Sequence, residues 1–122
     1  MNFKMIHLNF NVFNLEKSLK FYQEVLNLKE KRRIEAADGS YIIVYLGNEL
    51  SEFELELTWL ASQKQPYDLG DEEFHLAFEV TDYQATLAQH QKLGIVELVN
   101  EAMGIYFILD PDGYWIEILP AR

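Results

Sequence analysis

The stretch HLNFNVFNLEKSLKFYQ, residues 7–23, matches HLAFEVTDYQATLAQHQ, residues 75–91, at an offset of 68 positions. The ends of the two halves also match, at an offset of 61, where LEL at residues 55–57 lies over IEI at residues 116–118. Self-similarity of this kind indicates a duplicated structural unit. We therefore expect a single domain over residues 1–122, built of a module at 1–60, a polar linker at 61–73 and a module at 74–122.

Each half has the pattern of a strand, then a helix, then further strands. Apolar and polar residues alternate over residues 5–12, which predicts a strand, and apolar residues recur at helical spacing over residues 15–26, after Asn14 as the N-cap. A capping box that starts at Thr81 predicts the second helix, which ends near Leu93.

Five more stretches have strand patterns: residues 41–46, 53–59, 75–80, 105–109 and 114–119. The sequence DPDG at residues 110–113 is a typical turn and joins the last two of them. Together these elements predict an α+β fold of two half-sheets, each backed by a helix.

Composition and charge exclude several classes of protein. Hydrophobic residues make up 49% of the chain, which argues against disorder, and the lack of cysteine excludes disulfides and thiolate metal sites. The net charge of −10 argues against a nucleic-acid partner, since such binding neutralises phosphates with Lys and Arg. No apolar run approaches the roughly 20 residues that cross a bilayer, and residues 1–10 do not resemble a secretion signal. We therefore expect a soluble cytoplasmic protein with no membrane partner.

Four polar side chains fall on strand faces opposite the apolar residues: His7, Glu56, His75 and Glu117. Two imidazoles and two carboxylates, one of each per module, suit divalent nickel, cobalt, zinc, manganese or iron. Glu54 has the same parity as Glu56, so the pattern leaves the choice between these two carboxylates open. The sequence therefore predicts a metal site to which each module contributes one imidazole and one carboxylate.

Other polar residues have less specific patterns. His90 lies in the second predicted helix without a partner, so we expect it at the surface. The basic cluster Lys29, Lys31, Arg32 and Arg33 fits either a charged strand edge, which discourages aggregation, or a ligand-binding patch.

With these residues in place, the chain resembles glyoxalase I (lactoylglutathione lyase) of the vicinal oxygen chelate superfamily over nearly its whole length. The resemblance rests on LEKSLKFY at 15–22, ELELT at 54–58, YDLG at 67–70, FHLA at 74–77 and DPDGYWIE at 110–117. It implies two βαβββ modules that form concave mixed sheets.

The resemblance also implies a site and a reaction. His7, Glu56, His75 and Glu117 would be the metal ligands, which selects Glu56 over Glu54, and the metal would be Ni²⁺ or Co²⁺, with Zn²⁺ as an alternative. Glu117 would act as the catalytic base and Glu56 as its near-symmetric counterpart. The enzyme would convert the hemithioacetal of methylglyoxal and a thiol, glutathione or similar, to a lactoyl thioester through an enediolate.

In the family, two chains form a homodimer whose metal sites lie between subunits. This chain departs from the family's glutathione-binding pattern at Asn11, where an Arg is usual, and at Leu60, where an Asn is usual. The alternatives are another metalloenzyme of the superfamily, such as an epimerase, a thiol transferase or an extradiol dioxygenase, and a metal-free drug-binding resistance module. The pair of His and the pair of Glu argue against the last of these.

Overall fold

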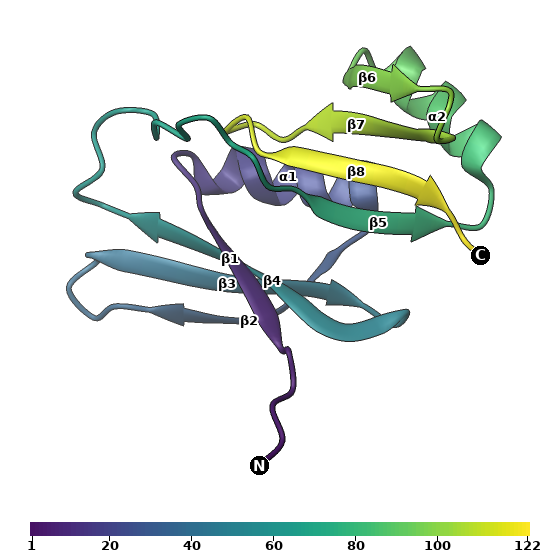
Figure 1. The fold of residues 1–122 in the computed structure, drawn as a ribbon. Coiled ribbons are helices and arrows are strands. Elements are labelled where there is room, and N and C mark those ends of the chain that lie inside the picture. The colour runs from purple at the N-terminus through teal and green to yellow at the C-terminus, as the bar shows by residue number, and fades with distance from the viewer. The chain divides into compact units, whose positions relative to one another are not determined.

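The computed structural model describes residues 1–122 and divides into two compact units, Met1–Tyr67 and Asp68–Arg122. The boundary falls inside the stretch predicted as the linker, residues 61–73. Each unit has one four-stranded mixed sheet and one helix in the order strand, helix and three strands (Figure 1). This is the α+β architecture of two βαβββ modules that the sequence predicts.

The first unit places its first strand beside its last. Its elements are β1 (His7–Asn11), α1 (Leu15–Leu26), β2 (Lys29–Glu35), β3 (Tyr41–Asn48) and β4 (Ser51–Leu60). The sheet order is β1-β4-β3-β2, with β1 parallel to β4 and the other neighbours antiparallel. The helix α1 contacts β4 and buries Leu15, Ser18 and Tyr22.

The second unit repeats this topology. Its elements are β5 (Leu76–Val80), α2 (Tyr83–Lys92), β6 (Val96–Asn100), β7 (Ile105–Leu109) and β8 (Trp115–Pro120). The sheet order is β5-β8-β7-β6, again with only the first pair parallel. The helix α2 contacts β6 and β8. Neither helix is long and apolar enough to span a membrane.

The helices begin at side-chain caps, one of them a residue later than expected. The Asn14 side chain accepts from the Lys17 amide at 3.1 Å, as predicted. The prediction that Thr81 caps the second helix was wrong: the carboxylate of Asp82 accepts from the Ala85 amide at 3.2 Å. Aspartate caps a helix as well as a hydroxyl residue does, so the helix starts after Asp82.

Two strands, β2 and β6, were not predicted from the sequence. All seven residues of β2 are exposed, so the strand shows no alternation of apolar and polar residues. It pairs antiparallel with β3 and shifts register between Glu30 and Arg32. Backbone pairing to a neighbour, rather than burial of its own side chains, therefore defines this edge strand.

The expectation that His90 lies at the surface was wrong. Its side chain is only 3% exposed, and its Nδ1 lies 2.8 Å from the hydroxyl of the fully buried Tyr106. Burial raises the pKa of Tyr106, so this phenol stays protonated. The last turn of α2 thus places a polar pair in the core of the second unit, where each partner satisfies the other.

The β7–β8 turn depends on one carboxylate. Asp110 is 5% exposed, and its Oδ1 accepts from the amides of Asp112 at 2.9 Å and Tyr114 at 2.8 Å. This arrangement fixes the start of β8, the strand that carries Glu117.

We predict that Asp110→Ala lowers the free energy of unfolding by about 1–3 kcal/mol, because one buried and one part-buried amide lose their acceptor. Urea unfolding would measure the change. Asp38→Ala is the control, since Asp38 accepts a single amide bond, from Ser40, at an exposed turn. Equal stability of the two variants would contradict the prediction.

Candidate functional site

In the first unit, parallel pairing of β1 and β4 brings a histidine to a glutamate. The register sets His7 opposite Glu54 and Asn9 opposite Glu56. The His7 side chain nevertheless lies near the second carboxylate, with Nε2 at 3.7 Å from Oε2 of Glu56. The structure therefore brings together the two residues that the sequence predicts for this module.

The second unit has the equivalent pair. His75 directly precedes β5, Glu117 lies in β8, and Nε2 of His75 is 3.4 Å from Oε1 of Glu117. The carboxylate side chains of Glu56 and Glu117 are 14% and 15% exposed, whereas both imidazoles are more accessible. Each unit thus holds one covered carboxylate with an accessible imidazole beside it.

Glu54, the alternative to Glu56, has a different partner. Its Oε1 lies 3.1 Å from a guanidinium nitrogen of Arg32, on β2. An ion pair of this kind already uses the carboxylate. Glu54 and Glu56, which share a strand face, therefore have different partners: Arg32 for Glu54 and His7 for Glu56.

Around Glu56 lie side chains that sequence reasoning did not assign to the site. Tyr45 on β3 is its cross-strand partner, and a hydrogen bond to the Glu56 carboxylate, together with burial, raises the pKa of the Tyr45 hydroxyl. The ring of Tyr45 meets His7 edge to face, with centroids 5.8 Å apart, and the Arg32 guanidinium lies 3.6 Å from the Tyr45 ring centroid.

The amide of Asn9 also contacts Glu56. We assign its nitrogen to the side facing the carboxylate, since the opposite orientation sets the Asn9 oxygen against Oε1 of Glu56; the Asn9 oxygen then faces the Asn11 amide at 2.7 Å, so that amide must present its nitrogen. That nitrogen then lies 2.9 Å from Oε1 of Glu56 and 2.6 Å from the hydroxyl oxygen of Thr58. Glu56 therefore has donors on both neighbouring strands. Only the register of the strands, which the sequence does not state, could have revealed Tyr45 and Asn9.

The donor atoms fit a divalent metal ion. An imidazole nitrogen and a carboxylate oxygen bind ions such as zinc at about 2.0–2.2 Å, and atoms 3.4–3.7 Å apart can both reach one ion at that distance. No group of three or more His, Asp or Glu side chains placed for a metal occurs in residues 1–122. Each unit by itself supplies two ligands.

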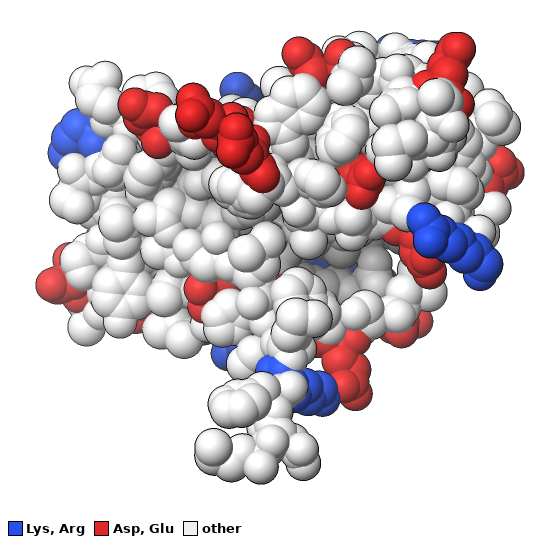
Figure 2. All heavy atoms as spheres, in the orientation of Figure 1, with Lys and Arg blue, Asp and Glu red and all other residues white.

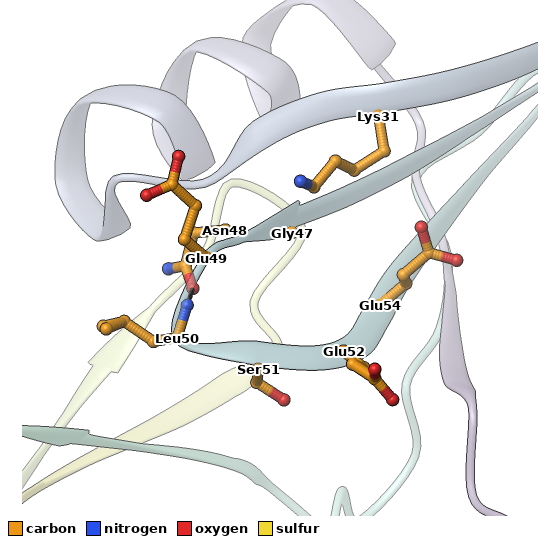
Figure 3. Close-up of a pocket in the computed structure, with 8 residues that line it drawn as sticks. All are labelled: Lys31, Gly47, Asn48, Glu49, Leu50, Ser51, Glu52 and Glu54. Atoms are coloured by element: carbon orange, nitrogen blue, oxygen red, sulfur yellow. Dashed lines mark hydrogen bonds between the residues drawn. The ribbon is translucent and has the colours of Figure 1, made fainter.

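A separate hollow lies at the β3–β4 hairpin (Figure 3). It has a volume of about 570 Å³ and is lined by Lys31, Gly47, Asn48, Glu49, Leu50, Ser51, Glu52 and Glu54. None of the four predicted site residues lines it. Acidic side chains are also spread over the face shown in Figure 2, with few basic ones, in keeping with the net charge of −10.

The two positions that depart from the glutathione-binding pattern lie in the first unit. Asn11 is the last residue of β1, and its side chain is 2.7 Å from that of Asn9. Leu60 is the last residue of β4 and is partly buried. Neither residue can form the charged contact that an Arg would offer to a carboxylate.

Comparison with known proteins agrees with the sequence prediction. The model of the Glyoxalase/Bleomycin resistance protein/Dioxygenase superfamily matches residues 4–118. A lactoylglutathione lyase of Neisseria meningitidis serogroup B is 38% identical over 131 residues, covering 98% of this chain and 91% of that protein. A lactoylglutathione lyase of Haemophilus influenzae is 31% identical over 126 residues, covering 95% and 91%.

Solved structures show the same likeness. The trypanothione-dependent glyoxalase I of Leishmania major is similar with a TM-score of 0.85 and 32% identity, over 98% of this chain and 87% of that one. Glyoxalase I from Zea mays has a TM-score of 0.81 and 27% identity, over 98% of this chain and 45% of that one.

These relatives confirm the predicted fold class and the predicted lyase function. The family model spans nearly the whole chain, and relatives above 30% identity match it almost end to end. The chain belongs to the glyoxalase I (lactoylglutathione lyase) family of the Glyoxalase/Bleomycin resistance protein/Dioxygenase superfamily.

Proposed function

We propose that this chain isomerises the hemithioacetal of methylglyoxal and a small thiol to a lactoyl thioester, with His7, Glu56, His75 and Glu117 as the ligands of one divalent ion. One observation carries the proposal: each unit holds an imidazole–carboxylate pair at the corresponding place, with N–O separations of 3.7 and 3.4 Å. Family membership supplies the reaction, and the two pairs supply the donors.

The four donors limit which ion fits. Two imidazoles and two carboxylates, without a thiolate, suit a divalent ion such as nickel, cobalt or zinc, and the resemblance to short members of the family favours Ni²⁺ or Co²⁺, with Zn²⁺ as the alternative. When bound, such an ion polarises the substrate carbonyl and stabilises the negative charge that develops on the adjacent oxygens.

The proton transfer falls to a carboxylate. Glu117 removes the proton from the carbon that bears the sulfur and the hydroxyl group, and the protonated Glu117 returns it to the neighbouring carbonyl carbon. The hydroxyl proton passes from the oxygen of the first carbon to the oxygen of the second, so that the first carbon becomes the thioester carbonyl, the second becomes a hydroxyl-bearing carbon, and no atom is gained or lost. Nε2 of His75 lies 3.4 Å from Oε1 of Glu117 and is the one polar side-chain atom beside this carboxylate.

We further propose a homodimer in which His7 and Glu56 of one chain share the ion with His75 and Glu117 of the partner subunit. Two ligands per unit are too few for a tetrahedral or octahedral ion, so each pair needs a second pair. The apolar side chains of Met1, Phe3 and Met5 are exposed, which also favours a partner.

The thiol belongs to the same proposal. The bacterial relatives are named for lactoylglutathione and the Leishmania enzyme for trypanothione, both of them peptide thiols. We propose a thiol of this class, and the cytoplasm as the place of action.

We predict that Glu117→Gln lowers the rate of thioester formation from methylglyoxal and glutathione by about 100-fold or more, because the amide cannot accept the proton. The rate would be measured on nickel-loaded protein. Glu79→Gln, on the exposed face of β5, should leave the rate unchanged. A Glu117→Gln variant as active as Glu79→Gln would exclude Glu117 as the base.

The choice between the two carboxylates of β4 predicts a difference in metal binding. Glu56→Ala should raise the Kd for Ni²⁺, measured by competition with a chelator, by more than about 10-fold. Loss of a residue that only hydrogen-bonds to a metal ligand already lowers metal affinity by about 10-fold, and loss of the ligand itself should lower it further. Glu54→Ala should raise the Kd far less than Glu56→Ala, because Glu54 is paired with Arg32 and reaches Glu56 only through other side chains. The reverse ranking would assign the ligand to Glu54.

The shared site predicts complementation between two inactive variants. His7→Ala and His75→Ala each lack one ligand, yet a mixed dimer has one intact site. After unfolding and refolding together, random pairing gives about a quarter of wild-type activity, since half of the dimers are mixed and each has one of two sites. If every site were built within one chain, mixing would restore nothing.

A further inference from the structure

The two imidazole–carboxylate pairs have equivalent places in the fold but different surroundings. Glu56 and Glu117 lie on the last strands of their units and are buried to nearly the same extent. The residues opposite them across the sheet differ in chemistry. This difference bears on which carboxylate can move.

Glu56 is held from both sides. Tyr45 on β3 is its cross-strand partner, near enough that the Glu56 carboxylate raises the pKa of the Tyr45 hydroxyl, and Asn9 on β1 is its partner on the other side, with the amide nitrogen 2.9 Å from Oε1. Two donors on two different strands restrict both the position and the rotation of the carboxylate.

The Tyr45 hydroxyl is itself fixed in place. The Tyr45 side chain is buried, its ring lies against His7, and the Arg32 guanidinium covers the ring at 3.6 Å from the centroid. Arg32 is held in turn by Glu54 at 3.1 Å. A chain of contacts therefore runs from β2 to the Glu56 carboxylate.

Glu117 has no such donors. Its cross-strand partners are Phe107 on β7 and Ala77 on β5, and Leu98 takes the place of Arg32 opposite Phe107. The Phe107 ring meets His75 edge to face at 5.3 Å, as Tyr45 meets His7, but it has no hydroxyl. The only polar side-chain contact of Glu117 is with His75.

We propose that Tyr45 and Asn9 are positioning residues that hold Glu56 as a fixed ligand, while Glu117, which lacks such donors, remains free to take and return the proton. This inference rests on the proposed function and deepens it. A carboxylate that accepts two hydrogen bonds is a weaker base and a better-oriented ligand, because both bonds favour its ionised form in one geometry.

The test is the affinity of the metal-stripped full chain for Ni²⁺, measured by competition with a chelator. Tyr45→Phe keeps the ring and its contacts with His7 and Arg32 and removes only the hydroxyl. We expect Tyr45→Phe and Asn9→Ala each to raise the Kd by about 10-fold. Tyr41→Phe, which removes an exposed hydroxyl from the same strand, should leave the Kd unchanged.

The outcomes are distinct. If the wild type binds Ni²⁺ tightly and Tyr45→Phe binds it equally tightly, the positioning role is overturned and the proposed function stands. If the wild type binds no Ni²⁺, both are overturned. A loss confined to Tyr45→Phe and Asn9→Ala supports the inference.

The mirror substitution tests the other carboxylate. Phe107→Tyr gives Glu117 the donor that Glu56 already has. We expect kcat to fall by about 10-fold and the Kd for Ni²⁺ to fall rather than rise, because the added hydroxyl fixes Glu117 as a ligand at the expense of its work as a base. An unchanged kcat would contradict the division of roles.

Discussion

Parallel pairing of the first and last strands of each unit is the constraint on which the site depends. Apolar residues of β1 and β4 stand in register, Leu8 with Leu55 and Phe10 with Leu57, so the core fixes the alignment. A slip of one residue would turn every side chain of β1 to the other face. That slip would bury His7 and separate it from Glu56. The same burial of apolar residues that folds each unit therefore also sets the distance between its imidazole and its carboxylate.

Much of the fold was predictable because the buried face of a helix or strand requires apolar residues at regular spacing in the sequence. The predicted helices and strands all occur, with ends that differ by two residues or fewer. Elements without such spacing were not predicted. One example is β2, whose residues are all exposed. His90 was misjudged for a related reason, since its partner Tyr106 is 16 residues away and only the packing of α2 brings the two together.

The site was predictable in part. Strand faces and the repeat were enough to find His7, His75 and Glu117, the family resemblance was needed to choose Glu56 over Glu54, and the two resulting pairs are each close in space. Their roles as ligands and bases stay predictions. Tyr45 and Asn9 could not be assigned, because parity gives the face of a side chain and not its neighbour across the sheet. Even when the buried face of each strand is known, two strands can pair in several registers. Turn lengths and packing determine which register forms.

The two halves differ where a conflict in the chemistry requires it. A carboxylate bound tightly to a metal is a weak base, and a carboxylate that moves freely is a loose ligand. If the two halves were identical, both glutamates would have the same surroundings, and neither would be the tighter ligand or the stronger base. Where the first unit has Tyr45, Asn9 and Arg32, the second has Phe107, Ala77 and Leu98 at the matching places, and so it lacks polar groups beside the carboxylate while its strand pairing is the same. Duplication thus supplies equal geometry, and in the proposed division of roles a few side chains on the neighbouring strands distinguish the glutamate held as a ligand from the glutamate that acts as the base.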